Sequence, residues 1–282
     1  MKVIIYGHKG WIASYIIKYF DSMNLEYFCS EYRVDDESNI EKEIVKVNPS
    51  HMLSLIGRTH GPGYNTIDYL ELPGKLHDNI KDNLYSPFIL AHFAMKYNKH
   101  LTYLGTGSIF NNYDKQFTEE DTPNFFGSSY SIVKGFTDRM MHLYEKNVLN
   151  LRIRMPITDD LAERNFITKI LLYKKICSNE NSMSVLPDLI PIMYKMMLDN
   201  ELGTYNFTNP GTISHNDILT MYKELVDETF TWTNITIEEQ DTILMSKRSN
   251  NQLNTDKLES KYNISNIKDS IKIIFDNIIK KI

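Results

Sequence analysis

A tyrosine and a lysine stand four residues apart in the segment Tyr130-Ser131-Ile132-Val133-Lys134. On a helix, this spacing puts both side chains on one face. A phenol that delivers a proton near neutral pH benefits from a nearby ammonium, which stabilises the phenolate and lowers the tyrosine pKa. The chain has 18 tyrosines, so chance also produces such pairs. The pair therefore needs support from its surroundings.

A threonine hydroxyl supplies that support. Thr106 follows an apolar run at 101–104 that predicts a strand, within Leu104-Gly105-Thr106-Gly107-Ser108. Ligands of doubly wound sheets bind at the carboxyl edge of the strands, where Thr106 and Tyr130 can meet on a substrate carbonyl. Strand-end capping by Thr106 and surface packing by Tyr130 are the alternatives, and the joint catalytic role outweighs both.

A glycine turn follows the first predicted strand, at Gly7-His8-Lys9-Gly10-Trp11-Ile12-Ala13. Glycines spaced in this way let the backbone turn sharply and approach a pyrophosphate at a helix N-terminus. Such turns are common, but the position at the first strand of an alternating fold favours dinucleotide binding.

The residues after the second predicted strand indicate which dinucleotide binds. An acidic residue there would hold the ribose 2′-hydroxyl of NAD, whereas the chain has Ser30 at this position and Arg33 shortly after it. Arg33, with His8 and Lys9, can bind a 2′-phosphate, which predicts NADPH. Two alternatives remain: Glu31 as an NAD-type ligand, and Arg33 as a solvated loop charge.

Strands and helices alternate through the first half of the chain. Strands are predicted at 3–6, 26–29, 52–56, 101–104 and 149–155, and helices at 11–20, 38–47, 77–97 and 130–145. This alternation predicts an α/β fold, a Rossmann-type doubly wound parallel sheet with helices on both faces. After Pro156 the alternation loosens, with helices expected at 165–175, 190–198 and 216–225. We expect a cofactor domain at 1–156, rejoined by about 189–208, and a smaller mixed substrate domain at 157–282.

Composition limits the partners. The formal charge of -5 argues against broad binding of nucleic acid. Cys29 and Cys177 lie far apart without metal-ligand spacing, so neither a disulfide scaffold nor a metal site is expected. No stretch has the length of a membrane span, which predicts a soluble cytoplasmic protein.

These motifs resemble the extended short-chain dehydrogenase/reductase family. GTYNF at 203–207 and RSNNQLNTDKL at 248–258 are similar to the dTDP-4-dehydrorhamnose reductases within it. More specific segments resemble the bifunctional 3,5-epimerase/4-reductases that make UDP-L-rhamnose in plants and in a giant virus: EEDTPNF at 119–125, RMPI at 154–157, RNFITK at 164–169 and YNFTNPG at 205–211. The low glycine content fits the viral version.

The resemblance implies a substrate and an order of steps. UDP-4-keto-6-deoxy-glucose would be inverted at C3 and C5 by a base and an acid, through an enolate, and hydride from NADPH would then reduce C4. In the reduction, Tyr130 would protonate the C4 oxygen, Lys134 would bind the nicotinamide ribose, and Thr106 would orient the carbonyl. If the protein is viral, as the resemblance implies, we expect it in the cytoplasm of the host.

The epimerisation pair departs from the family at one position. Family members use a cysteine two residues after the threonine and a lysine in the RNFITK segment, which correspond here to Ser108 and Lys169. A serine hydroxyl is far less acidic than a thiol, so we expect reduction to be faster than epimerisation. A natural variant and an introduced Cys-to-Ser replacement both account for Ser108, and we favour the second. Lys169 alone would be a solvated helix lysine.

The remaining expected contacts also follow the family. Trp11, Ile12, Gly57, Arg58, Asn83 and Pro156 would contact or brace the cofactor, and Asn165 and Arg248 the UDP group. An ordinary surface position is the alternative for Asn83 and for Arg248. The helices from His77 and Tyr130 resemble those of a homodimer interface, or they face the core. A reductase without epimerase activity and a non-catalytic NADP-binding regulatory subunit are the alternative functions.

Overall fold

A single parallel sheet organises the molecule, and the computed structural model describes residues 1–281 apart from the side chain of Tyr113. The strands follow the order β2-β1-β3-β4-β6-β8, and every neighbouring pair is parallel. Their bounds are β1 Lys2–Tyr6, β2 Glu26–Cys29, β3 His51–Ser54, β4 His100–Thr106, β6 Val148–Ile153 and β8 Gly203–Asn206. The doubly wound sheet expected from the alternation is confirmed.

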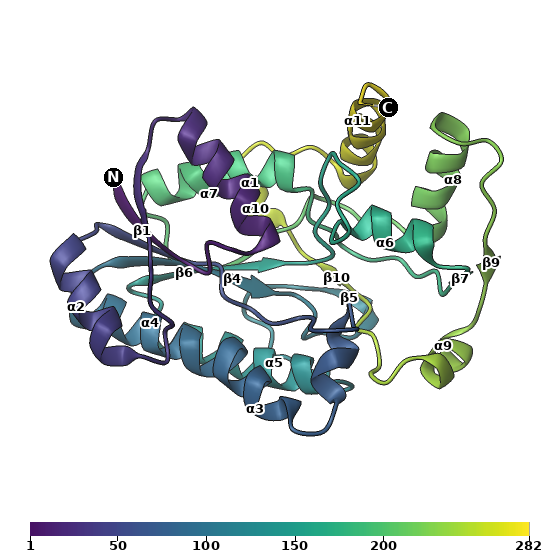
Figure 1. Ribbon diagram of the computed structural model, residues 1–282. Helices are drawn as coiled ribbons and strands as arrows, with labels where there is room; N and C mark the ends of the chain where they lie inside the picture. The colour runs from purple at the N-terminus through teal and green to yellow at the C-terminus, as the bar shows by residue number, and fades with distance from the viewer. Residues whose placement is uncertain (282) are drawn as a thin grey trace.

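Helices cover both faces of the sheet (Figure 1). One face packs against α1 and α7, and the other against α2, α4 and α5. The helices that surround the sheet are α1 Trp11–Ser22, α2 Glu37–Val47, α3 Lys75–Ile80, α4 Ser86–Lys96, α5 Ser129–His142, α7 Leu186–Leu198 and α10 Asp256–Glu259. Two apolar cores, one on each face, hold the layers together because each helix buries one apolar stripe against the strands.

The chain reverses direction across the sheet between β1 and β3. From β1 it builds outward to β2 on one side, and from β3 it continues through β4, β6 and β8 on the other. A crevice opens at the carboxyl ends of the strands where such a reversal occurs. The fold therefore places the turn after β1 and the loops after β3 and β4 around one site.

A second, mixed group of elements lies beyond the carboxyl edge of the sheet. It consists of α6 Phe166–Leu172, α8 His215–Leu225, α9 Ile237–Ile243 and α11 Ile267–Ile279, with the short strands β7 Lys175–Ile176 and β9 Thr233–Asn234. A separate apolar core forms among α6, α8 and α11. Because β8 lies in the main sheet, the chain returns to the first part before it completes the second. The domain boundaries themselves stay a prediction.

Two local features differ from the expected elements. The helix expected at 77–97 is interrupted at Lys81–Tyr85 by a π-helical turn, just before Pro87 near the start of α4. Proline has no N–H to donate into the preceding turn, and π-helical turns are frequent at functional sites. A further pair of strands, β5 Asn112–Phe117 and β10 Asn251–Leu253, was not expected from the sequence.

No helix within residues 1–281 is long and apolar enough to cross a membrane.

Two buried histidines lie side by side at the amino ends of β3 and β4. The rings of His51 and His100 have their centroids 4.7 Å apart, and their Nε2 atoms contact the backbone oxygens of Met197 and Glu201 at 3.0 and 2.7 Å. Burial, and the charge of His100, lower the pKa of His51 to about 4. Burial also lowers the pKa of His100. Both imidazoles are therefore neutral in the folded protein at pH 7.

This histidine pair predicts a loss of stability in acid. The unfolded state takes up a proton on His51 near pH 6.5 and the folded state only near pH 4, so the free energy of unfolding falls as the pH drops through this interval. Between pH 7 and pH 5 the loss from His51 alone is about 2 kcal/mol. Urea unfolding at both pH values measures it. His51→Gln is expected to reduce the pH dependence, whereas His77→Gln, at an exposed histidine, is expected to leave it unchanged.

Candidate active site

Three pockets join into one cleft along the carboxyl edge of the sheet. The first, of about 470 Å³, is lined by the turn after β1 and the loops after β2 and β3. The second, of about 320 Å³, contains Thr106, Tyr130 and Lys134, and the third, of about 680 Å³, reaches Arg248. Gly10 and Gly57 line both the first and the second pocket, and Ser108, Tyr130 and Lys169 line both the second and the third. The arrangement fits two extended ligands that meet in the second pocket.

The turn after β1 has the geometry of a phosphate site. Gly7 has φ +80°, and a Cβ there would lie 2.9 Å from the carbonyl carbon of Leu55, so only glycine fits. The N–H of Gly10 donates to the oxygen of Gly7 at 3.1 Å, and no side chain caps the N-terminus of α1. Free N–H groups at a helix N-terminus attract anions. His8 and Lys9 line the same pocket, and Trp11, Ile12 and Pro156 line the next one.

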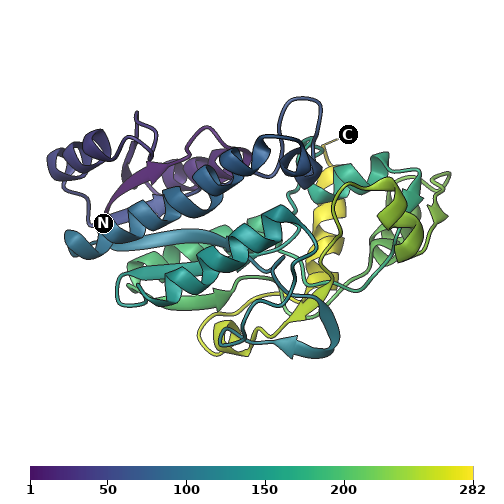
Figure 2. The same cartoon turned by 90° about the horizontal axis from the view of Figure 1, so that it is seen from below.

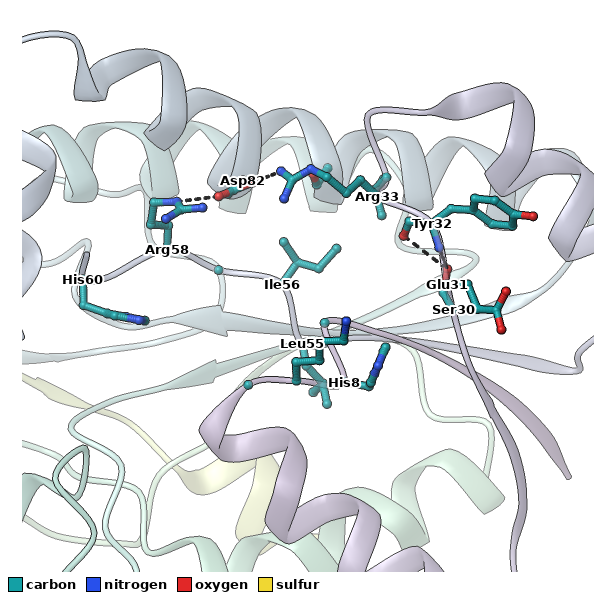
Figure 3. Close-up of a pocket in the computed structure, with 16 residues that line it drawn as sticks. His8, Ser30, Glu31, Tyr32, Arg33, Leu55, Ile56, Arg58, His60 and Asp82 are labelled. Carbon is teal, nitrogen blue, oxygen red and sulfur yellow. Dashed lines mark hydrogen bonds and ion pairs between the residues drawn. The ribbon is translucent and has the colours of Figure 1, made fainter. Parts of the chain in front are cut away.

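Two arginines line the far side of the first pocket (Figure 3). Arg33 contacts Asp82 at 3.2 Å and Asp35 at 3.0 Å, and the Nε of Arg58 donates to Asp82 at 2.6 Å. The backbone of Arg58 is braced by Asn83, whose amide accepts from its N–H and donates to its oxygen, both at 2.9 Å. This is the bracing contact expected for Asn83.

Ser30 lies at the end of β2, where an NAD-specific site would have a carboxylate. Its hydroxyl donates to Glu43 at 2.6 Å, and Glu43 also accepts from the N–H of Glu31 at 3.2 Å. The carboxylate of Glu43 therefore accepts hydrogen bonds from both the hydroxyl of Ser30 and the backbone N–H of Glu31. The cationic side of the pocket, with Arg33 and Arg58, fits a 2′-phosphate.

Thr106 and Tyr130 meet in the second pocket, as the sequence predicts. β4 ends at Thr106, and Ser128 caps the N-terminus of α5 so that Tyr130 lies in its first turn. The two side chains line this pocket together. Burial raises the pKa of Tyr130 to about 12, although the nearby hydroxyl of Thr106 and the positive charge of Arg154 act in the opposite direction. Tyr130 is therefore a protonated donor at neutral pH.

Lys134 has a different partner from the one expected. Its ammonium donates to the hydroxyl of Tyr103, a buried residue of β4, and lies 4.6 Å from the centre of that ring. Burial lowers the pKa of Lys134 to about 7, partly offset by the charge of Asp138 one helical turn away. The sequence predicted a tyrosine pKa lowered by this lysine. In the structure burial dominates the pKa values of both Tyr130 and Lys134.

Ser108 and Lys169 line the stretch shared by the second and third pockets. Ser108 is fixed by its backbone, because its N–H donates to Thr106 Oγ1 at 3.1 Å and its oxygen accepts from Ser131 at 2.7 Å. Lys169 Nζ donates to the backbone oxygen of Asn65 at 3.0 Å. Burial and the nearby charge of Arg164 lower the pKa of Lys169, which favours its neutral, basic form.

Arg248 and Asn165 have different environments. Arg248 lines the third pocket and pairs with Asp68 through two nitrogens at 2.8 and 3.2 Å. Burial alone would raise the pKa of Asp68, but the hydrogen bonds and charge of Arg248 hold it below its usual value. Asn165 is fully buried and lines none of the three pockets, since its amide caps α6 and bonds to Thr158 and Asp160. The structure thus gives Asn165 a capping role in place of the expected substrate contact.

The segment after Arg248 is fastened to the loop that carries Thr106 and Ser108. β10 pairs with β5 in parallel, and the side-chain amide of Asn251 donates to the backbone oxygens of Gly107 and Phe110 at 3.0 and 2.7 Å. Ser249 donates to the same oxygen of Phe110 at 2.7 Å. The segment after Arg248 and the loop after β4 therefore belong to one hydrogen-bonded unit.

Several residues of the cleft were not expected from the sequence. His60 and Arg164 contact each other between the first two pockets, Asp82 bridges two arginines, and Tyr103 holds Lys134. Asp82 adjoins the predicted Asn83, and Tyr103 lies three residues before Thr106. Their positions in sequence were visible, but their contacts come from elements far apart in the chain.

No protein-family model matches the chain, but individual proteins do. Protein L780 of Acanthamoeba polyphaga mimivirus is 55% identical over 268 residues, a match that covers 93% of each chain. A bifunctional dTDP-4-dehydrorhamnose 3,5-epimerase/reductase of Arabidopsis thaliana is 39% identical over 284 residues, covering 97% of this chain and 92% of the plant protein. The chain belongs to the nucleotide-sugar epimerase/reductases of the extended short-chain dehydrogenase/reductase family.

The solved structures agree with this family. The crystal structure of the mimivirus L780 UDP-rhamnose synthase superposes with a TM-score of 0.97 at 52% identity, covering 98% of this chain and 99% of that one. A dTDP-4-dehydrorhamnose reductase of Clostridium acetobutylicum shares the fold, with a TM-score of 0.84 at 18% identity and full coverage of both chains. At these identities the chain is not L780 with a single replacement at Ser108.

Proposed function

We propose that this epimerase/reductase converts UDP-4-keto-6-deoxy-glucose to UDP-L-rhamnose with NADPH, by 3,5-epimerisation followed by reduction at C4. The observation that carries the proposal is the continuous cleft, in which the Thr106–Tyr130 pair lies between a phosphate-binding turn and Arg248. L780, the more similar of the two sequence relatives, is a UDP-rhamnose synthase, whereas the plant relative is described with dTDP sugars. UDP is therefore the favoured nucleotide.

The first pocket fits NADPH. The glycine turn after β1 leaves room for a pyrophosphate, and Arg33 and Arg58 supply charge for a 2′-phosphate. When bound, NADPH supplies the hydride for C4. Its nicotinamide would lie in the second pocket, beside Trp11, Pro156 and Lys134.

Each half of the reaction uses its own residues. In the reduction, Tyr130 donates its phenol proton to the C4 oxygen, Thr106 orients that oxygen, and Lys134 contacts the nicotinamide ribose and adds positive charge. In the epimerisation, Lys169 removes or returns a proton at C3 or C5, because its lowered pKa favours the neutral amine. Ser108 holds the position of the second acid/base group. Arg248 binds the diphosphate as a bidentate donor.

The test is a single incubation of the purified chain with UDP-4-keto-6-deoxy-glucose and NADPH. Formation of UDP-L-rhamnose without another enzyme is the expected result, followed by chromatography and by loss of NADPH absorbance. Ser108 favours a second candidate, a reductase that needs a separate 3,5-epimerase. Product that forms only after such an epimerase is added would establish that candidate. Binding of NADPH without turnover under either condition would indicate a non-catalytic subunit.

We also propose a homodimer built on α4 and α5, which lie side by side on the outer face (Figure 2). Phe136 and Leu143 of this region are 62% and 80% exposed, unusually apolar for a solvated surface. Light scattering should give twice 33.0 kDa, and a mass of 33.0 kDa would contradict the dimer. Both cysteines are free, which fits the cytoplasm, or a host's cytoplasm, as the compartment.

A further inference from the structure

We propose that Asp82 determines the preference for NADPH by holding Arg33 and Arg58 in position for the 2′-phosphate. The inference rests on the proposed cofactor and adds a residue of the same pocket that acts through two arginines. Asp82 is thus a positioning residue, and its effect should be confined to ligands that carry the 2′-phosphate.

Three separate parts of the chain meet at this carboxylate (Figure 3). Arg33 comes from the loop after β2, Arg58 from the loop after β3, and Asp82 from the π-helical turn Lys81–Tyr85. Each carboxylate oxygen of Asp82 takes one arginine: Oδ1 accepts from Arg33 Nη2 at 3.2 Å and Oδ2 accepts from Arg58 Nε at 2.6 Å. The carboxylate therefore sets the separation of the two guanidinium groups.

The charged side chains on this side of the first pocket leave a net positive charge that can bind a phosphate. Arg33 and Arg58 bring two positive charges to one carboxylate at Asp82, while the neighbouring Asp35 is shared between Arg33 and Lys81. Without Asp82 the two cations would repel each other at short range. With it they lie on one side of the pocket and retain net positive charge there.

Flexibility makes such a contact necessary. The side chain of Arg33 is 62% exposed and is held by ion pairs to Asp35 and Asp82, whereas the side chain of Asp82 is 11% exposed. Ordering a long, exposed side chain on binding costs conformational entropy. Asp82 orders Arg33 before the ligand arrives, which lowers the cost of binding.

The π-helical turn aligns two consecutive residues with Arg58. Asp82 contacts its guanidinium, and the next residue, Asn83, bonds to its backbone N–H and oxygen. Arg58 is thereby fixed at both ends. Asp82 and Asn83, neighbours in the π-helical turn, therefore act on the same loop.

The experiment compares two adenosine probes that differ only in the 2′-phosphate. Calorimetry measures the binding of adenosine 2′,5′-bisphosphate and of adenosine 5′-monophosphate to the wild type and to Asp82→Asn. We expect the bisphosphate to bind about 10-fold more weakly to the variant, the equivalent of one positioned charge-assisted hydrogen bond, and the monophosphate to change by less than about twofold. Asp121→Asn removes a carboxylate that pairs with Lys115 outside the pocket, and is the matched control.

Each outcome decides the inference. Unchanged or tighter binding of the bisphosphate to Asp82→Asn would overturn it, and so would an equal loss for both probes, which indicates only a structural role. If Asp82→Asn does not fold, Asp82→Glu replaces it. This variant keeps the charge but lengthens the side chain, so a bisphosphate affinity equal to wild type would then overturn the inference. If the wild type bound both probes equally, the proposal that NADPH is the cofactor would itself be contradicted.

Discussion

Replacing Tyr130 with phenylalanine is expected to lower the rate of C4 reduction by about 1,000-fold, within the range that general acid catalysis contributes. Phenylalanine keeps the ring that packs against Tyr69 and Leu70, so the fold should survive. It removes the hydroxyl that donates the proton beside Thr106. The measurement is single-turnover oxidation of NADPH with a UDP-4-keto-L-rhamnose substrate that needs no epimerisation.

The matched control is Tyr69→Phe, at a buried tyrosine of the same cluster that lines none of the three pockets of the cleft. Its reduction rate should equal that of the wild type. Exchange of the C3 and C5 protons should survive in Tyr130→Phe far better than reduction does, because Lys169 acts there. A reduction rate unchanged by Tyr130→Phe would remove this residue from the catalytic machinery.

Replacing Ser108 with cysteine is expected to accelerate epimerisation by about 100-fold, the lower range for an added acid/base group. A thiol with an ordinary pKa of about 8.5 exchanges protons near neutral pH, and a serine hydroxyl does not. The backbone bonds that fix residue 108 do not involve its side chain, so the sulfur takes up the position of the hydroxyl. Deuterium uptake from solvent at C3 and C5 measures the rate.

Ser108→Ala serves as the control for this prediction. It should exchange deuterium as slowly as the wild type, if the hydroxyl takes no part in proton transfer, and both should reduce the epimerised substrate at the same rate. Deuterium uptake by the wild type at the rate of the cysteine variant would contradict the prediction. In that case another group in the cleft supplies the second acid/base function.

The sequence predicted five of the six strands of the sheet but placed no strand at β8, and it located the candidate catalytic residues at the ends of strands and the starts of helices. Strands and helices with a clear period alternate through the first half, and Thr106, Tyr130 and Lys134 follow strand and helix starts that are visible in the chain. The helix Ile267–Ile279 was missed although its apolar residues recur with helical spacing. That omission came from the loosened pattern after Pro156 rather than from a lack of signal.

Other features depend on contacts that no local pattern carries. The partner of Lys134 is Tyr103, on a strand 31 residues earlier, and the pairing of β5 with β10 joins residues more than 130 positions apart. The capping role of Asn165 likewise depends on the path of the chain before α6. The pKa of Tyr130 was expected to fall and instead rises, because the depth of burial becomes visible only in three dimensions.

The pairing of β5 with β10, and the hydrogen bonds beside it, affect which substrates can react. Because Asn251 and Ser249 fasten the chain after Arg248 to the loop that carries Thr106, the span from the diphosphate site to the reacting carbonyl is set by the protein. The fold therefore favours substrates whose length matches this span. A free 4-keto sugar, or one with a single phosphate, would lack the anchor that draws its carbonyl to Tyr130, and would lose turnover as well as affinity.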